Sequence, residues 1–177
     1  MTTTDPGAAT LSPAELRYEK QLARLEGSLR SWRTPARRRL LVRLNWACIA
    51  VMSAIAVTSY FWLPIAIAWI PMTVAICAAW SMLRTVIDMK DAAPARYLDE
   101  YETMTLLRAR STALKALVAI LMALGMLLVW ASSLEFGDGH RLAYALGGLA
   151  ILGVFVGGVI PAAAMARTMD PADPDDR

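Results

Sequence analysis

A run of 40 residues without one charged side chain, residues 44–83, is the feature that most constrains this chain. An α-helix rises about 1.5 Å per residue, so roughly 20 apolar residues cross the hydrocarbon core of a membrane. The run therefore predicts two crossings joined by a tight turn. Two further uncharged runs, residues 116–134 and 142–166, predict a third and a fourth crossing. The predicted fold class is all-α: a polytopic membrane protein with four transmembrane helices as two hairpins, plus an amphipathic N-terminal helix.

Prolines place the turn of the first hairpin. A break at Pro71 would leave too few residues for a second crossing, whereas a break at Pro64 leaves about 20 on each side. Pro64 is also expected to force Leu63 out of helical geometry, and Pro71 to kink the second span. Trp69 is expected to pack inside the bundle.

These runs divide the whole chain into segments. Outside the membrane we expect a disordered N-terminus over residues 1–11 and an amphipathic cytosolic helix over residues 12–33. We also expect a cytosolic connector over residues 84–115 and an acidic tail over residues 167–177. The first hairpin takes residues 35–83, with spans at about 44–62 and 64–83. The second hairpin takes residues 116–166, with spans at about 116–134 and 142–166.

The N-terminal helix has both a start signal and an apolar stripe. Ser12, Pro13 and Glu15 fit a capping box with proline at the first helical position. Five apolar residues then follow at spacings of 4, 3, 4 and 3, as in a heptad pattern. This stripe consists of Tyr18, Leu22, Leu25, Leu29 and Trp32. Two interpretations stay open: the helix lies on lipid headgroups or on the protein's own connector, or it docks a second copy or a partner.

Basic residues predict the topology. Of the 18 Lys and Arg residues, 17 lie in the N-terminal arm, the connector or the tail, and only Arg141 lies in a turn on the opposite side. The positive-inside rule therefore predicts that both termini lie in the cytosol. The composition, with 15 Arg against 3 Lys and much Ala, is typical of a high-GC bacterial genome, so we expect a multi-pass protein of a bacterial cytoplasmic membrane. A cluster just before the first span is expected to contact anionic lipid; it consists of Arg37, Arg38, Arg39 and Arg43. No fold or stacking platform supports nucleic-acid binding.

The connector is expected to contain a loop and then a helix. Asp99, Glu100 and Glu102 suit the first turns of a helix, and Arg108 and Arg110 follow farther along. This helix is expected to run directly into the third span.

Small residues mark one face of the fourth span. Gly153 and Gly157 form a GxxxG pair, and Ala150 and Pro161 extend the same face. Such faces let helix backbones approach closely. Two interpretations stay open here as well: packing within the four-helix bundle, or contact with a second copy or a partner.

No motif for chemistry is found in the chain. The predicted spans contain no Asp, Glu, Lys, Arg or His, which disfavours a secondary transporter, since ion pathways need such groups. Two cysteines and one histidine do not make a zinc site. There is no nucleophile–base pair and no phosphate-binding loop. We therefore expect no enzymatic activity, no cofactor and no metal.

One part of the connector has a recognisable pattern. It reads Asp88-x-Lys90-Asp91-x-x-Pro94, followed by residues 98–102 and then 108–111. This pattern resembles the linker between two transmembrane hairpins in uncharacterised small four-span membrane proteins of actinobacteria. The resemblance implies a source and a topology but no activity.

The leading hypothesis for function is a non-enzymatic accessory or scaffold subunit. It would use the small-residue face in the bilayer and the N-terminal stripe in the cytosol. The expected partners are membrane lipid and either further copies of the chain or another membrane protein. The alternative hypothesis is a small homo-oligomeric pore or membrane-perturbing protein of a defence or exclusion system, which would conduct ions in planar bilayers.

Overall fold

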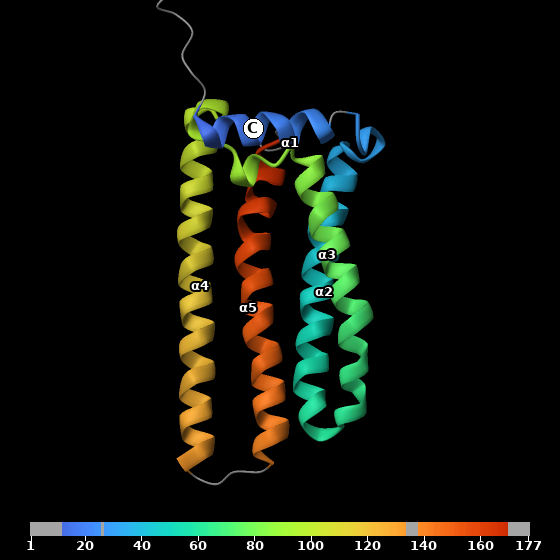
Figure 1. Ribbon diagram of the computed structural model, residues 1–177, viewed down its shortest axis with the longest axis vertical. Helices are drawn as coiled ribbons and strands as arrows, with labels where there is room; N and C mark the ends of the chain where they lie inside the picture. Colours follow the sequence, from blue (N-terminus) through green and yellow to red (C-terminus); the bar gives the residue numbers. More distant parts are fainter. Residues whose placement is uncertain (1–11, 26, 134–137, 170–177) are drawn as a thin grey trace, which may run out of the picture.

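The computed structural model describes residues 12–25, 27–133 and 138–169, and this part is helical without strands. Its five α-helices are α1 Pro13–Leu25, α2 Pro35–Phe61, α3 Trp69–Val86, α4 Glu100–Ser133 and α5 Gly139–Thr168. Helix α1 lies across one end of the bundle formed by the other four, and α5 ends there too (Figure 1). We call this the α1 end. The predictions of disorder in residues 1–11 and of the tail over residues 170–177 lie outside the described residues.

Four helical segments are long and apolar enough to cross a membrane, namely Pro35–Phe61, Leu63–Val86, Glu100–Ser133 and Gly139–Thr168. This finding confirms the all-α polytopic fold class and makes the chain a multi-pass membrane protein. Helix α5 packs against both α4 and α2, and α2 packs against α3 (Figure 1).

The core of the bundle consists of two apolar clusters. One lies at the α1 end and includes Leu41, Leu83, Leu106 and Met165. The other lies farther along the spans and includes Met52, Ile76, Leu152 and Val159.

The first hairpin reverses beside Pro64. Helix α2 ends at Phe61, and Trp62 is extended, with φ −139°. A 3-10 helix, η2 Leu63–Ala68, then leads into α3. The extended residue is thus Trp62, and the expectation for Leu63 is wrong. Pro71 lies in the first turn of α3, where a missing N–H costs no helical hydrogen bond, and the irregular backbone precedes it.

The N-terminal segment is not one helix over residues 12–33, and that prediction is wrong. Helix α1 ends at Leu25, Gly27 and Leu29 have φ of 83° and 53°, and a short 3-10 helix, η1 Arg30–Trp32, follows. Glycine adopts this left-handed conformation without steric cost, so Gly27 permits the turn. The predicted start is confirmed: Ser12 Oγ accepts from the Glu15 N–H at 3.3 Å, and the Glu15 carboxylate accepts from the Ser12 N–H at 2.6 Å.

The connector contains two short 3-10 helices, η3 Lys90–Ala92 and η4 Ala95–Tyr97. Asp88 and Met89, just before η3, are both left-handed, with φ of 52°. Asp99 Oδ1 then accepts from the Glu102 N–H at 2.6 Å and caps α4. As predicted, α4 runs without interruption from the connector through the third span.

Candidate interaction surfaces

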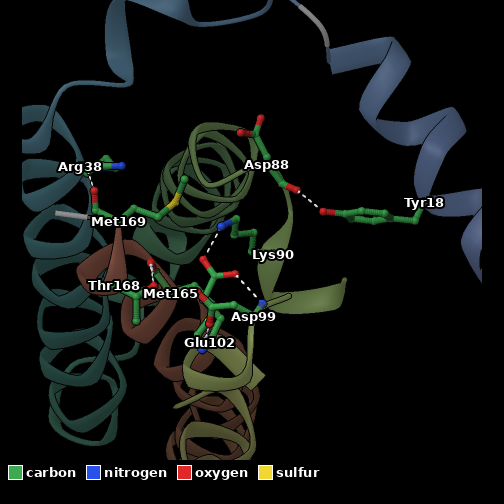
Figure 2. Close-up of polar contacts among 9 residues, drawn as sticks. All are labelled: Tyr18, Arg38, Asp88, Lys90, Asp99, Glu102, Met165, Thr168 and Met169. Atoms are coloured by element: carbon green, nitrogen blue, oxygen red, sulfur yellow. Dashed lines mark hydrogen bonds and ion pairs between the residues drawn. The ribbon is translucent and has the colours of Figure 1, made fainter. Parts of the chain in front are cut away.

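Tyr18 fastens α1 to the connector. Its side chain is 6% exposed, and its hydroxyl donates a hydrogen bond to the Asp88 backbone carbonyl at 3.0 Å (Figure 2). Its ring also packs against the ring of Tyr97, with 5.1 Å between the centroids. Burial, together with the nearby carboxylates of Asp88, Asp91 and Glu102, raises the pKa of Tyr18 to about 12. Tyr18 therefore acts as a neutral anchor for α1.

Ion pairs between the connector and its neighbours hold the α1 end together. Arg33 pairs with Asp88 at 2.7 Å. Arg84 pairs with Asp91 at 2.9 Å, and the Asp91 side chain is only 10% exposed. Such partly buried pairs are less screened by salt than surface pairs.

Helix α4 joins this network at its first turn and again farther along. Lys90 pairs with Glu102, which also helps to cap α4 (Figure 2). Arg110 donates to the Asp91 backbone carbonyl at 2.8 Å. Three acids of this region, Asp88, Asp91 and Glu102, are thus paired with cations. Among the described residues, no group of three or more His, Cys, Asp or Glu is placed to hold a metal ion.

The predicted cytosolic stripe is turned toward the protein's own bundle. Tyr18 is buried, and Leu25 lines a groove between α1 and α3 together with Trp80. Leu29 and Trp32, which the turn at Gly27 separates from α1, pack against the apolar cluster at the α1 end. Leu22 is half-buried. Of the two interpretations, these contacts fit the helix that lies on its own connector, and they leave no continuous stripe for a partner.

The predicted lipid-binding arginines have different environments. Arg38 is 6% exposed, and its guanidinium donates to the Met169 backbone carbonyl at the end of α5 at 2.8 Å (Figure 2). Arg37 donates to the Ser31 carbonyl at 2.5 Å. Arg39 and Arg43 are exposed. The lipid assignment of Arg38 is therefore wrong, because its charged group is buried against another helix.

The two glycines of the GxxxG pair are also in different environments. A Cβ built on Gly153 would lie 3.3 Å from Leu117 Cδ1 and 3.4 Å from Ile120 Cγ2, both on α4. A Cβ built on Gly157 would meet nothing within 4 Å. Ala150 and Pro161 are half-buried. Gly153 thus serves packing within the bundle, whereas Gly157 faces open space.

Two other glycines of α5 receive tryptophan rings from α3. A Cβ on Gly148 would lie 2.6 Å from Trp69 Cζ2, and one on Gly158 would lie 3.4 Å from Trp80 Cζ2. The two glycines are 10 residues apart on α5 and the two tryptophans 11 apart on α3, and because both pairs follow the same chain direction, α3 and α5 run parallel. Sequence reasoning found Trp69 as a packing residue but missed both partners. The only signal in the sequence is that Gly and Trp recur at similar separations on the two spans, and this signal does not distinguish Gly148 from the neighbouring Gly147.

Helix α4 has a largely exposed membrane span. Only 6% of its most apolar 18-residue stretch is buried, against 44% in α2 and 39% in α5. Toward the end far from α1, the surface of α4 carries an apolar groove of about 330 Å³. Its lining consists of Leu121, Met122, Gly125, Met126, Val129 and Trp130. A Cβ on Gly125 would meet nothing within 4 Å, so nothing in the described chain fills this groove.

Comparison with protein-family models, curated proteins and solved structures finds no match to this chain. The resemblance of the connector to actinobacterial membrane proteins therefore stays a prediction.

Proposed function

We propose that the protein is a non-enzymatic accessory subunit that binds an apolar transmembrane helix of a partner protein through α4. The exposed span of α4 and its groove carry this proposal. Helix α4 packs chiefly against α5, and its apolar stretch is less buried than that of any other candidate span among the described residues, 6% against 11% for Leu63–Val86 and more for the other two. A small residue such as Gly125 in a groove lets the backbone of another helix approach closely. Within a membrane, helices associate through such close packing, because the lipid tails are as apolar as the helices and no hydrophobic effect drives the helices together.

The Arg-rich, Lys-poor composition supports a bacterial cytoplasmic membrane as the location, and the charge pattern supports an orientation with the α1 end in the cytosol. In that orientation the groove around Gly125 lies toward the outer leaflet. The partner surface would be apolar, because the groove offers no charged group with which a polar helix could pair.

The test is to fill the groove. We expect Gly125→Leu to abolish co-purification of the partner from native membranes in a mild detergent, as measured by native mass spectrometry. Gly147→Leu is the matched control, since a Cβ at Gly147 also meets nothing within 4 Å. The control should keep the partner. Recovery of the isolated chain alone from wild-type membranes would contradict the proposal. Recovery of a closed ring of identical chains that conducts ions would also contradict it and would support the alternative hypothesis of a homo-oligomeric pore.

A further inference from the structure

A second groove lies at the α1 end of the bundle, between α2, α4 and α5, and has a volume of about 320 Å³. Trp46 of α2 lines it, together with Thr105, Arg108 and Thr112 of α4 and Ile160 and Arg167 of α5. Alanines complete the lining. This groove is separate from the one around Gly125.

Two cations line the groove without a counter-charge. Arg108 and Arg167 come from different helices, and both are exposed. Neither guanidinium has a hydrogen bond or an ion pair within the described chain, and no acidic side chain lines the groove. Two acids of the connector are paired with other cations, Asp91 with Arg84 and Glu102 with Lys90. Two free guanidiniums at one groove favour a phosphate, whose oxygens accept charge-assisted hydrogen bonds.

The groove lies where the polar and apolar parts of the helices meet. Arg167 directly follows the uncharged run that ends at residue 166, and Trp46 lies near the start of the run over residues 44–83. Tryptophan and arginine at such positions mark the headgroup level of a membrane. A phosphate bound here would thus sit at the depth of lipid headgroups.

An apolar path continues from the groove toward the middle of the bilayer. Gly157, Ile160, Ala164 and Arg167 are spaced 3, 4 and 3 residues apart and so share one face of α5. Ile160 and Ala164 line the groove, and the space beside Gly157 is open. One turn farther from the groove, at Gly153, α5 is in close contact with α4, so the open space ends there. The open stretch is suited to the first part of an acyl chain.

We propose that this groove binds one anionic phospholipid. Arg108 and Arg167 hold the phosphate, the threonine hydroxyls lie beside the headgroup, and one acyl chain runs along α5 past Gly157. This assignment does not depend on the partner proposed for α4. It also differs from a diffuse attraction of lipid to the basic cluster before α2, because it requires two particular arginines on two helices.

The test uses the full-length protein in detergent, titrated with phosphatidylglycerol or with phosphatidylcholine and followed by native mass spectrometry. We expect one tightly bound phosphatidylglycerol, and at least about tenfold weaker binding in the Arg108→Gln/Arg167→Gln variant, from the loss of two phosphate contacts. The control, Arg17→Gln/Arg24→Gln, removes two exposed charges from α1 and should bind like the wild type.

Three results would overturn the proposal. Equal weakening in both double variants would show diffuse surface charge instead of a site. Equal affinity for phosphatidylcholine would show that the net charge of the lipid is not recognised. Displacement of the lipid by millimolar inorganic phosphate, with no effect of Gly157→Leu, would show a phosphate site that needs no acyl chain. Folding of each variant is checked by its thermal unfolding in the same detergent.

Discussion

Tyr18 shows what a single residue contributes at the α1 end. The sequence placed it on the apolar stripe of the N-terminal helix, which is correct, but gave no sign that its hydroxyl would bond to the Asp88 carbonyl. That bond joins residues 70 positions apart and depends on the left-handed backbone at Asp88. A heptad pattern reports which side chains share a face, but it does not report which backbone carbonyl a loop will turn toward them.

The raised pKa of Tyr18 predicts an alkaline loss of stability. The fold favours the neutral phenol, so its contribution is complete below pH 10, the ordinary pKa, and is lost as the pH rises toward about 12. We expect Tyr18→Phe to lower stability near neutral pH by about 1 kcal/mol, through loss of one hydrogen bond, and to flatten the decline above pH 10. Thermal unfolding in detergent as a function of pH measures both effects. Tyr101→Phe, at a site 70% exposed, should leave the profile unchanged, and an unchanged slope in Tyr18→Phe would contradict the assignment.

Arg38 and Arg43 provide a second comparison at this scale. Arg38→Ala leaves the Met169 carbonyl without its donor at the end of α5, and we expect a loss of about 1–3 kcal/mol in stability. Arg43→Ala, at an exposed position, should cost less than about 0.5 kcal/mol. Guided by the sequence alone, both residues were expected to bind lipid. Equal unfolding temperatures for the two variants would argue against a buried structural role for Arg38.

At the scale of elements, the contact between α3 and α5 depends on glycines that receive tryptophan rings. The sequence indicated a face of small residues on α5, and Gly153 does pack against α4. The sequence did not indicate that Gly148 and Gly158 receive rings from α3. The spacing of glycines along one helix does not predict which side chains of a neighbouring helix will pack against them. The same limit applies to the turn at Gly27, where the heptad spacing of Leu29 and Trp32 continued although the helix did not.

Adjacent glycines in α5 allow a sharp test of this contact. Gly148→Ala places a methyl group 2.6 Å from the Trp69 ring and should lower stability by about 1–3 kcal/mol, since the rigid ring has to move. Gly147→Ala introduces the same methyl group into open space and should be neutral or slightly stabilising. The measurement is thermal unfolding in detergent. The ring contact would be refuted by two variants of equal stability.

For the whole molecule, the number and rough positions of the spans followed from the sequence. A segment that crosses the hydrocarbon core of a membrane has to be a long, largely uncharged helix, and such segments are visible in the sequence. The order of packing did not follow. All four spans are apolar on most sides, so composition could not show that α5 would lie between α4 and α2 or that α4 would stay exposed. For the same reason the groove lined by Arg108 and Arg167 was not predicted, since its residues come from three separate helices.

The charge pattern predicts a definite orientation of the whole chain, with the α1 end in the cytosol. In a background without Cys48 and Cys77, the thiol of a His140→Cys variant should react with a membrane-impermeant maleimide in intact cells. The thiol of an Arg96→Cys variant should react only after permeabilisation, because Arg96 lies in the connector at the α1 end. The reverse pattern would show the opposite orientation, and labelling of both thiols in intact cells would rule out a crossing between them.

The length of α4 and its attachment near one end have a mechanical consequence. Helix α4 is one uninterrupted helix of 34 residues, roughly 50 Å long at about 1.5 Å per residue, and its first turns are clamped by Lys90 while its far half is held along one side only. A long helix attached at one end converts a small change of tilt at that end into a larger displacement at the other end. Breaking or tightening the clamp at Glu102 would swing the far end of α4 sideways in the opposite leaflet by a larger distance than the movement at the clamp itself.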